Sequence, residues 1–167
     1  DKYQDVFDRI ILQDGTSFAV HDDLMHYFPG RFNVHSPAAV ELHVTYDVFK
    51  GQPKSVSLTE DVAPERDYLP SASSLTGCLF MADAGYFSKS YIQKLQDASA
   101  FFISRMSNSV NPMAVCNNSQ QTKPLQSWLK ELPSTGALDL DVHWPDGPIY
   151  RCVAFAALDH KKRHVLV

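Results

Sequence analysis

Cysteines are scarce in this 167-residue chain, and the three present form no recognisable pattern. Cys78, Cys116 and Cys152 are widely spaced, odd in number and contain no CxxC pair. A disulfide-stapled scaffold and a zinc ribbon both require paired cysteines, so the sequence argues against both. We expect buried free thiols in a reducing compartment.

Long apolar runs and an excess of positive charge are also missing. No apolar run approaches the roughly 20 residues of a membrane span, and the first residues do not read as a signal peptide. A cytoplasmic protein without a membrane partner is therefore expected. Fifteen Lys and Arg stand against 19 Asp and Glu, giving a formal charge of -4. Any surface that binds a polyanion would have to be local.

Hydrophobic periodicity predicts an α/β unit followed by a strand-rich segment. Strands are expected at residues 10–20, 40–49, 54–60, 78–82 and 100–106, with a helix at 88–98 and weaker helical stretches at 21–30 and 63–75. Beyond residue 107 the sequence predicts a polar, turn-rich stretch at 108–123, a helical turn or two at 124–132, and strands at 138–142, 149–158 and 164–167. A chain that stops within a strand is expected to be a domain fragment.

Two apolar runs lead into aspartates, Asp14 and Asp83, and each aspartate is followed closely by a glycine. A carboxylate at the end of a buried strand is costly to desolvate and usually has a partner. If the two strands are neighbours, both carboxylates meet at one sheet edge and suit Mg²⁺ or Mn²⁺, which prefer oxygen ligands. Paired ions of this kind promote phosphodiester cleavage or transfer. The alternative is a pair of solvated turn aspartates, since Asp-Gly is common in turns.

Three segments in this order resemble the catalytic core of bacterial insertion-sequence transposases of the DDE type. They are residues 13–17 (QDGTS), 41–53 (ELHVTYDVFKGQP) and 82–88 (ADAGYFS). The resemblance implies a ribonuclease-H-like fold, a mixed α/β sheet with flanking helices, over residues 1–107. It also implies that residues 108–167 are the start of a β-rich insertion.

The same resemblance implies the activity. Asp14 and Asp83 would be the catalytic residues and the ligands of two Mg²⁺ or Mn²⁺ ions. The full-length parent would hydrolyse and join DNA at transposon ends, with DNA as its partner and a homodimer as its assembly.

The sequence departs from the family pattern at three positions. The third acid of the family is a helical glutamate flanked by tyrosine, arginine and lysine, and Glu131 lacks those neighbours at the required spacings. We expect that helix to follow residue 167 in the parent, which would leave this fragment inactive. Ala84 stands where relatives commonly have arginine, and Glu41 where they often have lysine. Another ribonuclease-H-like nuclease and an inactive DNA- or protein-binding remnant are therefore the alternatives.

Candidate DNA contacts are few. The concentrated basic run at 160–164 supplies Lys161, Lys162 and Arg163, and Arg105 follows a core strand. These cations would neutralise phosphates, although a solvated turn is the ordinary interpretation of the basic run. Tyr86 would stack on an unpaired base, unless it is simply a core aromatic.

Overall fold

The computed structural model describes residues 5–32, 35–107, 109–117, 119–132, 135–145, 147–156 and 163–167. The chain divides into two compact units, Asp1–Phe102 and Ile103–Val167. Whether these units are a catalytic core and an insertion divided at residue 107 stays a prediction. Each unit is described separately below.

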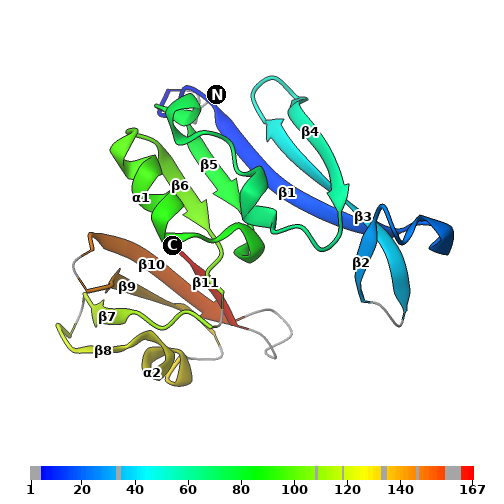
Figure 1. Cartoon of the computed structure of the whole chain (residues 1–167). Helices are drawn as coiled ribbons and strands as arrows, with labels where there is room; N and C mark the ends of the chain where they lie inside the picture. Colours follow the sequence, from blue (N-terminus) through cyan, green and yellow to red (C-terminus); the bar gives the residue numbers. More distant parts are fainter. Residues whose placement is uncertain are drawn as a thin grey trace. The chain divides into compact units, whose positions relative to one another are not determined.

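The first unit is built on a mixed sheet with the strand order β2-β3-β1-β5-β6 (Figure 1). The strand β4 also pairs with β3, along the edge of β3 that faces away from β1. The strands are β1 (Ile10–Ala19), β2 (Pro29–Phe32), β3 (Ser36–Asp47), β4 (Gln52–Glu60), β5 (Leu79–Ala82) and β6 (Phe101–Ser104). The long β3–β4 hairpin confirms the alternating pattern seen in the sequence.

The central strand β1 has one antiparallel neighbour and one parallel neighbour. It pairs antiparallel with β3, where Gly15 lies opposite His43 and Gln13 opposite Thr45. On its other side it pairs parallel with β5, and the register ends with Gln13 opposite Ala82. Because side chains alternate across a strand, Gln13 and Asp14 project to opposite faces of this sheet.

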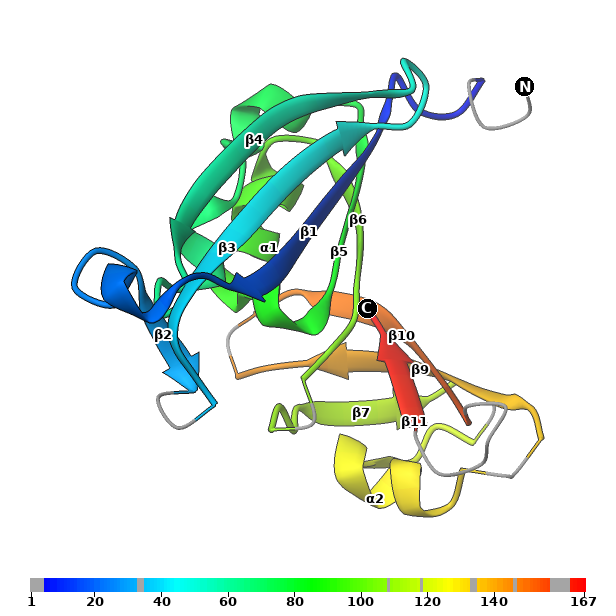
Figure 2. The same ribbon diagram turned by 90° about the vertical axis from the view of Figure 1, so that its right-hand side faces the viewer.

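One face of this sheet carries the hydrophobic core. Its buried cluster comprises Ile11, Leu75, Cys78, Phe80 and Leu95. The helix α1 (Lys89–Asp97) contributes Ile92 and Leu95 to the buried face, and the Ser88 hydroxyl caps it by accepting from the Tyr91 amide. In Figure 2, α1 lies behind the strands and covers one face of the sheet.

Four short 3₁₀ turns complete the first unit: η1 (Asp22–Leu24), η2 (Glu65–Tyr68), η3 (Ala72–Leu75) and η4 (Ala84–Tyr86). The helix expected at 63–75 is therefore present only as η2 and η3, separated by Pro70, which disfavours helical backbone before it and cannot donate a hydrogen bond. The stretch at 21–30 gives η1 and the first residues of β2.

The second unit is a five-stranded sheet in the order β11-β10-β9-β7-β8, with one short helix. Its elements are β7 (Met113–Cys116), β8 (Thr122–Pro124), α2 (Leu125–Lys130), β9 (Ala137–His143), β10 (Ile149–Ala156) and β11 (Arg163–Leu166). Trp128 of α2 is buried and donates its indole N–H to the carbonyl of Ala114 at 3.1 Å. This bond fixes the helix to β7.

The strands β7 and β8 were not expected from the sequence, which gives only polar, turn-rich residues at 108–123. They are three or four residues long, so they offer little alternation to detect. Cys78 and Cys152 are buried free thiols as expected, whereas Cys116 is half-buried. Among the described helices, none is long and apolar enough to cross a membrane.

The core of the first unit gives a direct stability prediction. Leu95 is 1% exposed and Leu58 is 56% exposed, so the same truncation has different consequences at the two positions. Leu95→Ala should lower the free energy of unfolding by about 2–5 kcal/mol, and Leu58→Ala by less than about 0.5 kcal/mol. Urea denaturation followed by circular dichroism measures both, and equal losses would contradict the assigned core.

Candidate functional site

The structure brings the two sequence-predicted aspartates onto neighbouring strands. The parallel pairing of β1 with β5 ends at Gln13 and Ala82, and Asp14 and Asp83 are the next residues along the two strands. Asp14 lies within β1, which continues to Ala19 in agreement with the strand expected at 10–20, so Asp14 ends the apolar run but not the strand. Asp83 directly follows β5 in extended backbone and precedes η4.

Both carboxylates belong to exposed residues. One oxygen of Asp14 accepts a hydrogen bond from the Gly15 amide at 2.9 Å. Strand alternation places Asp14 on the face opposite Gln13, and the extended backbone of Asp83 continues the alternation of β5 to the same face. Two oxygen donors on adjacent strands suit a hard divalent cation. Within the described ranges, no group of three His, Cys, Asp or Glu side chains is arranged to hold a metal ion.

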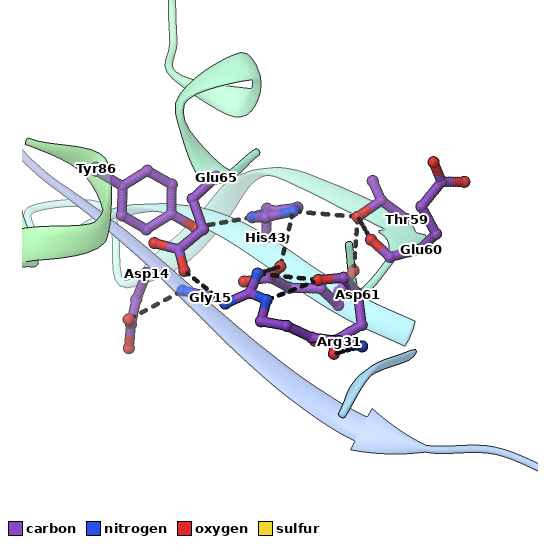
Figure 3. Close-up of polar contacts among 10 residues, drawn as sticks. Asp14, Gly15, Arg31, His43, Thr59, Glu60, Asp61, Glu65 and Tyr86 are labelled. Carbon is purple, nitrogen blue, oxygen red and sulfur yellow. Dashed lines mark hydrogen bonds and ion pairs between the residues drawn. The ribbon is translucent and has the colours of Figure 1, made fainter. Parts of the chain in front are cut away.

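The buried Tyr86 lies on the other side of β1 from the Asp14 carboxylate, with its hydroxyl close to Gly15 (Figure 3). A Cβ atom added at Gly15 would lie 2.7 Å from the Tyr86 hydroxyl and 2.9 Å from Oε1 of Glu41. A glycine is therefore required at position 15 because two side chains occupy the space of its missing methyl group. The turn interpretation of Asp14-Gly15 does not apply.

The Tyr86 hydroxyl is 2.8 Å from Nδ1 of His43, and the other ring nitrogen of His43 is 3.2 Å from the Thr59 hydroxyl. Thr59 donates its only hydroxyl proton to a backbone carbonyl, that of Glu60 at 3.2 Å. With that proton engaged, the Thr59 oxygen is free to accept from Nε2–H of His43, and we assign the neutral tautomer with Nδ1 accepting from Tyr86. The hydrogen bonds form a directed chain from Tyr86 through His43 to β4.

Burial shapes the acid–base behaviour of this group. His43 is 2% exposed and stacks on Tyr68 with ring centroids 4.1 Å apart. Burial lowers the pKa of His43, which favours the neutral imidazole. Burial also raises the pKa of Tyr86 to about 12, so its hydroxyl keeps its proton and acts as a donor.

A single cation balances the acids next to His43. The guanidinium of Arg31 is 3.3 Å from Glu41 and 3.7 Å from Glu65, and its Nη2 donates to the backbone carbonyl of Asp61 at 2.9 Å. Burial, with repulsion from Glu65, raises the pKa of the Glu41 carboxyl despite Arg31. The family difference at Glu41 thus has a local explanation, because Arg31 supplies the opposite charge.

Glu65 also contacts the turn that follows Asp83. A Cβ atom at Gly85 would overlap the Glu65 carboxylate, with Oε1 only 3.0 Å away and Oε2 closer still. Gly85, like Gly15, therefore allows a close approach of an acidic side chain. Turn η4 is contacted by Glu65 at Gly85 and by His43 at Tyr86.

Gln13 is the remaining polar residue under the aspartates. It is buried, and its Oε1 accepts from the Thr45 hydroxyl at 2.6 Å. Its Nε2 has no hydrogen-bond partner of good geometry in the described part of the chain, although the side chain is near enough to Tyr86 to oppose the rise in its pKa. Leaving a buried amide N–H unpaired costs free energy, so the free energy of burying Gln13 depends on how closely Tyr86 approaches it.

The structure places the candidate DNA-binding residues in different environments. Tyr86 is 3% exposed, so the prediction that it stacks on a base is not supported by this conformation. Arg105 is exposed and forms an isolated antiparallel bridge with Leu166. Arg163 begins β11, and Lys161 and Lys162 lie outside the described residues. A role for these four cations in binding DNA stays a prediction.

Sequence reasoning missed the buried network because its signal was weak. His43, Thr45 and Glu41 occupy the alternating positions of β3 that a half-buried strand would normally give to apolar residues. Their polarity makes them resemble the solvent-facing half of the hairpin. The alternation of polar and apolar residues in β3 is visible in the sequence. Only the pairing of β3 with β1 shows that the polar set is the buried one.

Comparisons with known proteins identify the family of this chain. A family model described as a transposase DDE domain matches residues 5–140. The chain is 26% identical over 107 residues to the transposase for insertion sequence element IS1151 of Clostridium perfringens, and the match covers 63% of this chain and 23% of that protein. It is 25% identical over 107 residues to the transposase of IS231F from Bacillus thuringiensis subsp. israelensis, covering 22% of that protein. The chain thus spans about a quarter of these relatives.

A solved structure supports the fold. The piggyBac transposase, in a synaptic complex with hairpin DNA, superimposes with a TM-score of 0.50 over 94% of this chain and 32% of that one, at 12% sequence identity. The ribonuclease-H-like α/β class expected from the sequence is therefore confirmed. With the family model matching most of its length, the chain belongs to the transposase DDE domain family.

Proposed function

We propose that this chain is part of the catalytic domain of a DNA transposase, in which Asp14 and Asp83 hold divalent cations. One observation carries the proposal: the parallel register of β1 and β5 makes the two aspartates neighbours on adjacent strands. Their exposure leaves them accessible to a cation and to a phosphate group. The domain boundary at residue 107 forms part of this proposal.

Two Mg²⁺ or Mn²⁺ ions held there would supply activation of a water or 3'-hydroxyl nucleophile and stabilisation of the leaving oxygen. The chain's own contribution is to present two oxygen donors from adjacent strands at fixed spacing. Because Glu131 lacks the tyrosine, arginine and lysine that flank the third acid of the family, we propose that the third acid lies in another part of the full-length parent. The chain alone would then bind metal weakly and cleave little DNA.

The proposed substrate is DNA at transposon ends, with hydrolysis and strand transfer at the same site, in a cytoplasmic homodimer. Support comes from the family and from the DNA complex of the piggyBac transposase. Arg105, Lys161, Lys162 and Arg163 remain the proposed phosphate contacts. An inactive DNA- or protein-binding remnant is the alternative, with Arg31 giving the unusual Glu41 a local counter-charge.

Metal binding to the 167-residue chain tests the site. Mn²⁺ should broaden the amide NMR signals of Asp14 and Asp83 first, because a paramagnetic ion relaxes nearby nuclei. Asp14→Asn or Asp83→Asn should weaken this binding at least about tenfold and change the free energy of unfolding by less than about 0.5 kcal/mol. Asp22→Asn, at an exposed acid of η1, is the control and should bind as the wild type does. Broadening confined to other residues would refute the site.

DNA cleavage by the full-length parent tests the activity. Removing a metal ligand costs several kcal/mol of transition-state stabilisation, so either Asp→Asn change should slow strand cleavage by about a hundredfold or more. The measurement is cleavage of labelled transposon-end DNA with Mg²⁺, followed by a strand-transfer assay. Full activity of either variant would overturn the proposal, and hydrolysis without strand transfer would favour another ribonuclease-H-like nuclease.

A further inference from the structure

Tyr86 connects the surroundings of both aspartates through its own contacts. It is three positions after Asp83 in the sequence, and its hydroxyl lies against Gly15, which directly follows Asp14. Its amide donates to the carbonyl of Asp83 at 3.1 Å, which closes turn η4. A shift of the Tyr86 ring would therefore alter the path of the chain at Asp83 and the space under Asp14.

A directional hydrogen bond to His43 orients the hydroxyl of this ring. The hydroxyl donates to Nδ1 of His43 at 2.8 Å, and the two rings meet edge to face with an interplanar angle of 84°. His43 is itself fixed, because it stacks on Tyr68 and its second nitrogen donates to Thr59. The hydroxyl thus anchors η4 to β3, two strands away from β5.

We propose that Tyr86 is a positioning residue, whose hydroxyl bond to His43 sets the spacing of the Asp14 and Asp83 carboxylates for metal binding. This inference rests on the proposed function. It assigns Tyr86 a role on the buried side of the sheet and not at the DNA surface. Tyr86 touches neither substrate nor metal in this role.

The chain contains a matched control. Tyr91 is also a tyrosine with a largely buried hydroxyl, which donates to the carbonyl of Pro70 at 2.6 Å, and burial raises its pKa as it does for Tyr86. Tyr91 lies on α1, packs against the core cluster that includes Phe80, and directs its hydroxyl to Pro70 and not to His43. Tyr86→Phe and Tyr91→Phe therefore remove the same group, and only the first removes a bond that anchors η4.

The experiment compares Mn²⁺ binding and thermal unfolding of the wild type and both variants in the 167-residue chain. Both variants should lower the melting temperature by similar amounts. Tyr86→Phe should also raise the dissociation constant for Mn²⁺ about fivefold, which is the loss of one net hydrogen bond converted to affinity. Tyr91→Phe should leave it unchanged. Equal affinities of the two variants would overturn the positioning role.

Two further measurements keep the inference testable if Tyr86→Phe does not fold. Thr59→Val keeps the branched shape but removes the acceptor of His43 Nε2–H, so it should weaken Mn²⁺ binding about twofold or more. Nitrogen NMR of the His43 ring in the wild type should show the Nε2–H tautomer, and the Nδ1–H tautomer would contradict the assigned bond. If the wild type shows no Mn²⁺ effect at Asp14 and Asp83, the proposed function fails; if it does and the variants bind equally well, only the inference fails.

Discussion

The parallel pairing of β1 with β5 is the constraint on which the candidate site depends. The two strands are separated in sequence by β2, the β3–β4 hairpin and three short 3₁₀ turns, and their register makes Asp14 and Asp83 neighbours. The hydrophobic cluster around Ile11 and Phe80 stabilises that register from one face, because a slip by one residue would exchange the buried and exposed sides of β5. Core packing and carboxylate placement are thus two results of the same strand alignment.

The polar network under the site extends this constraint. Between Ile11 and the far end of β1, the buried side of the sheet changes from aliphatic residues to Gln13, His43 and Glu41. Buried polar groups are costly unless they are paired, so they favour a specific arrangement over a loosely packed one. Arg31 is central to that pairing, since Glu41, Asp61 and Glu65 all interact with it. The network therefore specifies the geometry of η4 more narrowly than an apolar core would.

The sequence predicted the parts of the molecule that follow from local patterns. The hairpin, the strand β5, the capped helix α1 and the order of the two aspartates were all accessible, because alternation, apolar runs and caps are local signals; the apolar run at β5 is buried only at Phe80, so it did not indicate a fully buried strand. The short strands β7 and β8 were missed for lack of such a signal. The buried role of Tyr86 and the ion pair of Arg31 with Glu41 were missed because they join segments 43 and 10 positions apart, which no local pattern encodes.

The close contacts at Gly15 and Gly85 have a consequence for how this domain tolerates change. The aspartates are exposed, whereas each nearby glycine occupies a space that no other residue fits without displacing a neighbouring side chain. Within each of these two short segments, folding therefore restricts the glycine, and the proposed metal binding restricts the aspartate. In a library of variants sorted only for folded protein, Asp14 and Asp83 would be lost early while Gly15 and Gly85 would persist, leaving intact domains that have lost their ligands.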